Sequence, residues 1–78
     1  MRELVEYIVR SLVDDPTQVV VREEHHGIHY SFHLKVAKED MGRVIGKGGR
    51  VASAMRTLLK IAAAQEGKRA SLDIIEQE

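Results

Sequence analysis

The sequence predicts an α+β domain whose elements follow the order helix, strand, strand, helix, helix, strand. Three observations support this prediction. Apolar residues recur at helical spacing near the N-terminus and over 50–65, they alternate at strand spacing over 28–36, and a cluster of glycines separates the two middle helices. A chain of 78 residues has room for only a small core, so we expect one domain over residues 1–78.

The first half of the chain contains one helix and two strands. Residues 2–14 fit an amphipathic helix, which ends there because Pro16 disfavours helical geometry in the residue before it. Residues 19–22 form a β-branched strand, and residues 28–36 form a second strand with its apolar side chains on one face. Residues 24–27 are expected to connect the two strands as a hairpin loop.

The second half contains two helices and a last strand. Residues 38–45 fit a short helix that Gly46–Gly49 interrupts, and residues 50–65 fit the longest helix of the chain, which Gly67 ends. Residues 71–75 complete the domain as a strand. The core-facing stripe of the long helix is expected to contain Val51, Met55, Leu58, Leu59 and Ala62.

Charge and composition narrow the function classes. Twelve basic residues balance twelve acidic ones, but the segment 35–69 carries nine basic residues against three acidic ones. This local excess suits a polyanionic ligand, and a solvated helix face explains it equally well. Because there is no cysteine, disulfides and thiol catalysis are excluded. No apolar run approaches a membrane span and no targeting peptide is evident, so we expect a cytoplasmic protein that does not associate with membranes.

The glycine cluster calls for a physical explanation, because a plain turn between helices needs only one glycine. Gly46, Gly48 and Gly49 leave room for a ligand backbone, while Lys47, Arg50 and the free N–H groups of the following helix favour phosphate. A nucleotide-hydrolysing P-loop is excluded because a helix, and not a strand, precedes the cluster and because no hydroxyl residue follows Lys47. The dinucleotide fingerprint GxGxxG is also absent.

The string Gly46–Gly49, preceded by Val44 and Ile45, resembles the GxxG signature of KH domains, whose loops hold about four nucleotides of a single strand. The element order resembles the prokaryotic (type II) KH fold, which implies a three-stranded sheet with helices packed on one face. With residues 39–43 before the loop and 56–60 on the long helix, the whole chain is similar to the KhpA family of small bacterial RNA-binding proteins.

The resemblance implies a non-catalytic protein that binds single-stranded RNA and needs no cofactor. It further implies an RNA chaperone or post-transcriptional regulator that acts with a KhpB (Jag)-like KH partner and is linked to cell elongation and cell-wall homeostasis. The glycine loop would hold the sugar-phosphate backbone, three apolar residues would line the groove for the bases, and two arginines would contact phosphate. The expected RNA-binding residues are Arg43, Val44, Ile45, Gly46, Lys47, Gly48, Gly49, Arg50 and Val51. Ala52 stands where many KH signatures have a large aliphatic residue, which puts the rim of the groove in doubt.

The four histidines at positions 25, 26, 29 and 33 raise the question of a metal site. On a strand, His29 and His33 share one face but lie about 13 Å apart, which is too far for one ion to bridge. We therefore expect no metal site and no catalytic residues.

The long helix has a wider apolar arc than a two-layer domain requires. Ala54, Leu58 and Ile61 extend this arc, either as the edge of the core or as a surface for self-association. We expect a homodimer through these three residues. The alternative function, from a different class, is a protein–protein interaction (dimerisation) module in which the glycine loop is only structural.

Overall fold

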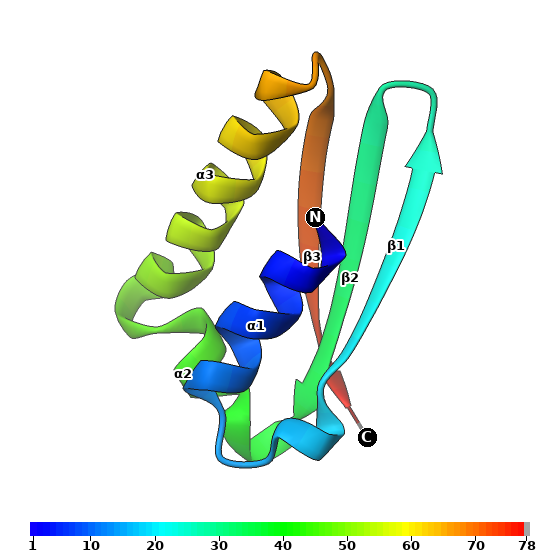
Figure 1. Cartoon of the computed structure of the whole chain (residues 1–78). Coiled ribbons are helices and arrows are strands. Elements are labelled where there is room, and N and C mark those ends of the chain that lie inside the picture. The colour runs from blue at the N-terminus through cyan, green and yellow to red at the C-terminus, as the bar shows by residue number, and fades with distance from the viewer. Residues whose placement is uncertain (78) are drawn as a thin grey trace.

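The computed structural model describes residues 1–77 and has the element order that the sequence predicts (Figure 1). Short 3-10 turns at Pro16–Gln18, Lys38–Asp40 and Lys47–Gly49 connect the main elements. The main elements are α1 (Arg2–Leu12), β1 (Val20–His26), β2 (His29–Ala37), α2 (Met41–Ile45), α3 (Arg50–Gln65) and β3 (Arg69–Gln77).

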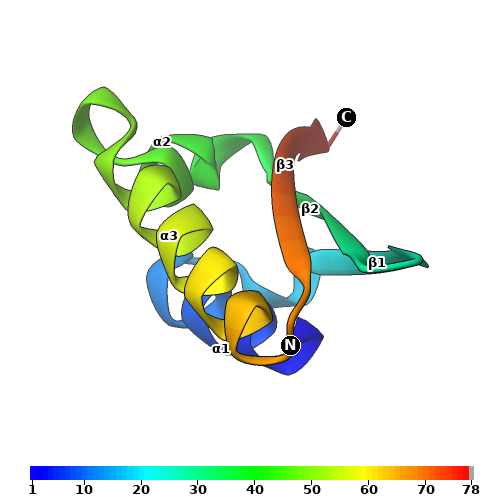
Figure 2. The ribbon, with the colours of Figure 1, turned by 90° about the horizontal axis from the view of Figure 1, so that it is seen from above.

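The three strands form one mixed sheet in the order β1-β2-β3. β1 is antiparallel to β2, and β3 is parallel to β2, so that Phe32 of the central strand lies between Glu23 and Leu72. All three helices lie on the same side of the sheet (Figure 2), which confirms the predicted α+β fold with helices packed on one face. The outer edges of β1 and β3 carry backbone groups that no strand of the described chain pairs.

The core lies between this sheet and the helices. Val5 and Val9 of α1 face Phe32, Leu34 and Val36 of β2, as the helical and strand periodicities of the sequence predict. From α3 the buried residues are Ala52, Met55, Leu59 and Ala63.

The buried stripe of α3 therefore differs from the predicted one. Leu58 was expected in the core but is 49% exposed, and Ala52 takes a buried position in its place. The physical reason is close packing. The helix turns the small side chains of Ala52 and Ala63 toward the sheet, because they allow close approach, and this orientation leaves the larger Leu58 outside the core.

Two strands are longer than predicted. β1 extends to His26, so the connection to β2 is the two-residue turn Gly27–Ile28 and not a loop over 24–27. Ile28 lies exposed in this turn and does not continue the core face of β2. Pairing with β2 satisfies backbone N–H and C=O groups, and it extends β1 and β3 beyond the segments of high β-propensity.

The predicted helix over 38–45 is divided into the 3-10 turn Lys38–Asp40 and α2. Asp40 is buried at this division and accepts hydrogen bonds from the backbone N–H groups of Asp14 and Asp15, at 3.1 and 3.2 Å. It thereby ties the segment that follows α1 to the start of α2. Among the described residues, no helix is both long enough and apolar enough to cross a membrane.

Candidate nucleic-acid interface

The glycine loop, Gly46–Gly49, projects from the end of α2 and leads directly into α3. A backbone hydrogen bond from the N–H of Gly49 to the carbonyl of Gly46, at 3.1 Å, closes it into a tight turn. Gly48 has a φ of +60°, and a Cβ placed there would meet nothing within 4 Å. The space above the loop is therefore open, and the bare backbone can approach a ligand closely.

Gly46 has a different role from Gly48. Its φ is +74°, and a Cβ there would overlap the Cγ2 atom of Val51 and lie 2.8 Å from the Cβ atom of Val51. Gly46 therefore lets the loop sit directly on the first turn of α3. Val51 is half-buried beneath the loop and packs against the core, so it supports the loop from below. That it also lines the groove stays a prediction.

The two apolar residues before the loop point in different directions. Val44 is 0% exposed and belongs to the core, which corrects the prediction that it lines the groove. Ile45 is partly exposed at the end of α2 beside the loop, where an apolar wall for a nucleobase was expected. Alternation of this kind follows from helical geometry, since neighbouring side chains are rotated by about 100° around the axis.

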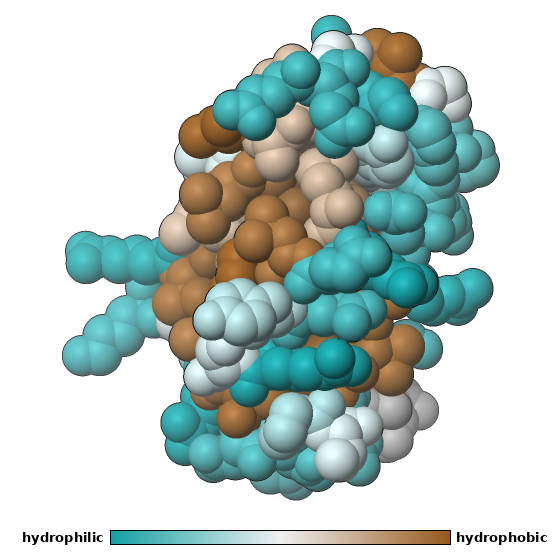
Figure 3. All heavy atoms as spheres, in the orientation of Figure 1, coloured by the Kyte–Doolittle hydropathy of each residue, from teal (hydrophilic) through white to brown (hydrophobic). Residues whose placement is uncertain are grey.

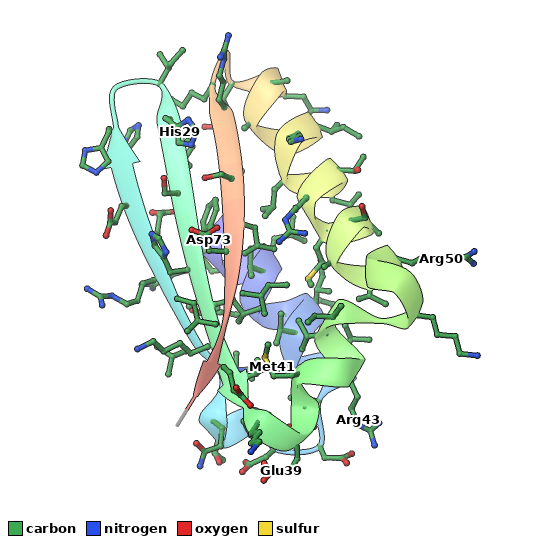
Figure 4. All side chains as sticks on the ribbon, turned by 180° about the vertical axis from the view of Figure 1, so that it is seen from behind. His29, Glu39, Met41, Arg43, Arg50 and Asp73 are labelled. Atoms are coloured by element: carbon green, nitrogen blue, oxygen red, sulfur yellow. The ribbon has the colours of Figure 1, made fainter. Side chains whose placement is uncertain are left out.

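The cations near the loop also differ from one another. Lys47 and Arg50 are exposed, and Figure 4 shows Arg50 pointing away from the sheet into solvent. Neither of them forms an ion pair with any residue between 1 and 77. The N–H of Arg50 donates to the carbonyl of Lys47, and no side chain caps the N–H groups that follow it in the first turn of α3. Loop, helix end and cations together form a site suited to phosphate.

Arg43 differs from Lys47 and Arg50 in having carboxylate partners. Its guanidinium lies 3.0 Å from the carboxylate of Asp14 and 3.7 Å from that of Asp40. Two carboxylates therefore balance its charge, and they bind it to the junction between α1 and α2. Its side chain is nevertheless 54% exposed, so the contact of Arg43 with phosphate stays a prediction, and such a contact would compete with these two carboxylates.

A cleft between α3 and the edge strand β3 lies farther along α3 from the loop. The Nε atom of Arg56 donates a hydrogen bond to the backbone carbonyl of Leu72 at 3.1 Å, across the cleft. The cleft section around this bond has a volume of about 160 Å³, and its lining residues are Arg56, Leu59, Lys60, Ala70, Ser71 and Leu72. Sequence analysis did not single out Arg56, although its spacing of four residues from Lys60 places both cations on one flank of the helix.

The outer face of α3 is apolar and exposed. Leu58 and Ile61 are 49% and 54% exposed, and the neighbouring Ala54 is also exposed. Figure 3 shows a band of hydrophobic surface on this side of the molecule, over α3 and toward α1, where Leu4 is partly exposed. Ile61 is therefore a surface residue and not the edge of the core.

The histidines lie on the hairpin and the outer face of the sheet. His29 pairs with the hydroxyl of Ser71 at 3.1 Å, and the Nδ1 atom of His33 lies 3.6 Å from the carboxylate of Asp73 (Figure 4). Within the described residues, no three potential ligands are grouped so that they could hold a metal ion.

Comparison with known proteins gives one family. The family model described as KhpA/KhpB, KH domain, matches residues 2–74. A protein of Caldanaerobacter subterraneus subsp. tengcongensis named "RNA-binding protein KhpA" is 53% identical over 75 residues, which are 96% of this chain and 100% of that protein. Proteins of the same name from Clostridium acetobutylicum and Listeria monocytogenes are 51% and 47% identical, over 96% and 97% of this chain and 100% of their own lengths. No solved structure matches the chain.

Proposed function

The chain belongs to the KhpA/KhpB family of KH domains, whose members are non-enzymatic, and we propose that it binds single-stranded RNA through the glycine loop. One observation carries this proposal: the open space above Gly48 lies beside the uncapped start of α3 and two unpaired cations, Lys47 and Arg50. Relatives that match nearly the whole chain are named RNA-binding proteins, which supports the same ligand. The chain would act as a single KH domain over residues 1–78.

In this proposal, the RNA backbone crosses the loop where no side chain stands above Gly48. Lys47 and Arg50 neutralise adjacent phosphates, and the free N–H groups at the start of α3 donate to a phosphate oxygen. Ile45 offers an apolar surface beside the loop for a base. These contacts require a flexible strand with accessible bases, which favours single-stranded over duplex RNA.

The test is the double variant Lys47→Asp/Gly48→Asp, measured by gel shift with single-stranded RNA. Two carboxylates would then face the phosphates, so binding is expected to be lost, while the exposed loop keeps the core intact. The matched control is Lys38→Asp/Gly27→Asp, which changes the charge equally and replaces another glycine with a positive φ at an open position. Undiminished binding by the loop variant, folded by circular dichroism, would refute this mechanism.

A second part of the proposal concerns assembly. One KH groove holds few nucleotides and binds weakly, so two grooves joined in one complex would gain affinity through effective concentration. The exposed apolar surface of Ala54, Leu58 and Ile61 supports a two-fold homodimer through α3, or a complex with a KhpB (Jag)-like KH domain. If the wild type binds no RNA, and the wild type and the loop variant form the same assembly, the alternative of a pure interaction module takes precedence.

The cellular part of the proposal follows from the family. We propose a cytoplasmic RNA chaperone or post-transcriptional regulator that contributes to cell elongation and cell-wall homeostasis. Sequencing of the RNA that co-purifies with the wild type and with the loop variant tests it. Transcripts enriched only with the wild type are expected, and identical RNA in both samples would count against it.

A further inference from the structure

The cleft between α3 and β3 does not end at Arg56. A second section, with a volume of about 420 Å³, continues toward the far end of α3, and both sections share Lys60 and Ala70. This volume lies in the range of small-ligand sites. The far section is lined by His29, Lys60, Ala64, Lys68, Arg69 and Ala70.

The polar lining of the far section is basic. Lys60, Lys68 and Arg69 carry positive charge, no carboxylate lines the section, and none of the three cations forms an ion pair with the described part of the chain. The cavity on the neighbouring side, toward α1, is instead lined by the carboxylates of Glu3, Glu23 and Glu66 together with Arg2 and the N-terminus. The charges at this end are therefore divided, with carboxylates on the side toward α1 and cations on the side toward β3.

Backbone hydrogen bonds hold these cations in position. The N–H of Lys68 donates to the carbonyl of Ala63, and the N–H of Arg69 donates to the carbonyl of Ile28, both at 2.8 Å. The Nζ atom of Lys68 donates to the hydroxyl of Tyr30 at 2.8 Å and lies 4.8 Å from the centre of its ring. This hydrogen bond raises the pKa of Lys68 above its usual range and holds its ammonium at Tyr30, which lines the acidic cavity toward α1. Lys60 and Arg69 are therefore the cations that the far section offers to a ligand.

We propose that this far section is a second phosphate-binding site, which receives the same RNA strand after it has passed the glycine loop. This inference rests on the proposed function and extends it from a single clamp to a track along α3. The 16 residues of α3 separate the two sites by about 24 Å. A strand stacked at ~3.4 Å per nucleotide needs about seven nucleotides to cover this distance, so the footprint exceeds the four of a single KH loop.

The experiment compares oligouridines of 4 and 8 nucleotides by NMR titration of the full chain. Both RNAs are expected to shift the amide signals of Gly48 and Arg50, whereas only the 8-mer should shift those of Lys68 and Ala70. An 8-mer that merely bridges the glycine loops of two copies would leave Lys68 and Ala70 unshifted, and this result overturns the proposal. If neither RNA shifts the loop signals, the proposed function fails as well.

Salt dependence gives the second measurement, by fluorescence anisotropy with the 8-mer. The variant Lys60→Ala/Arg69→Ala removes two cations of the far section and is expected to make the slope of log K against log salt shallower by about 1.4, at about 0.7 per phosphate contact. The matched control is Arg22→Ala/Lys38→Ala, two exposed cations that line neither section, and its slope should equal that of the wild type. An equal slope for the cleft variant, with 4-mer binding intact, overturns the far site alone.

Discussion

Asp40 shows how one side chain can organise a junction between elements. Among residues 1–77 it is the only charged residue classed as buried, and it is 2% exposed. Its two carboxylate oxygens accept hydrogen bonds from the backbone N–H groups of Asp14 and Asp15. The Nε atom of Arg43 lies 3.7 Å from its Oδ1 atom and balances its charge. A buried carboxylate is stable only with such partners, so these contacts explain the position of Asp40.

At this scale we predict that Asp40→Ala destabilises the protein by about 2 kcal/mol, because two partly buried N–H groups lose a charged acceptor. The exposed neighbour provides the control, since Glu39→Ala should change the stability by less than about 0.5 kcal/mol. Urea denaturation followed by circular dichroism measures both. Equal stability of the two variants would show that the carboxylate of Asp40 does not hold this junction.

The side chains of α3 face three directions: the sheet, the cleft toward β3 and solvent. Ala52, Met55, Leu59 and Ala63 face the sheet. Arg56 and Lys60 flank the cleft toward β3, and Leu58 and Ile61 face solvent. One element thus contributes to the core, the proposed RNA track and the proposed dimer surface, and Leu59 belongs both to the core and to the lining of the cleft.

For this helix we predict that Ile61→Asp gives a folded monomer, because a carboxylate cannot be buried in an apolar helix–helix contact. The matched control is Ser53→Asp, which adds the same charge at an exposed position of α3 about 80° around the helix from Ile61. Sedimentation equilibrium at tens of micromolar should give a dimer for the wild type and the control. A monomeric wild type would remove the dimer from the proposal.

On the scale of the whole molecule, a balanced total charge conceals a polarised surface. Twelve basic and twelve acidic residues cancel in the sequence. Acidic side chains nevertheless gather around α1. Two of the acidic residues, Asp14 and Asp40, form ion pairs with Arg43. Lys47, Arg50 and the cations of the α3–β3 cleft have no carboxylate partner within the described chain. Binding of a polyanion depends on these unpaired cations and not on the net charge.

We therefore predict that a 4-nucleotide RNA binds with a slope of log K against log salt of about −1.4, from two contacts at about 0.7 each. Arg43→Ala should leave this slope unchanged, because its guanidinium already pairs with Asp14 and Asp40. Anisotropy titrations between low and moderate salt provide the measurement. A slope near −2, reduced by Arg43→Ala, would return Arg43 to the phosphate contacts.

The sequence alone determined the order of the elements, the extent of α3 and the position of the glycine loop. These features are local: helical and strand periodicities appear within a few residues, and Gly46 and Gly48 adopt a positive φ that other residues rarely take. The family model likewise matches one continuous stretch, residues 2–74, so membership of the family follows from the order of residues alone.

Only the tertiary structure decided which way individual side chains face and which of them are free. Val44 is in the core, Leu58 is outside it, Arg43 is paired and Arg56 reaches across to β3. Each outcome depends on a partner distant in sequence, such as Asp14 for Arg43 and Leu72 for Arg56. Periodicity fixes the spacing of residues around a helix, but the rotation of that helix against the sheet is set by how its small and large side chains pack.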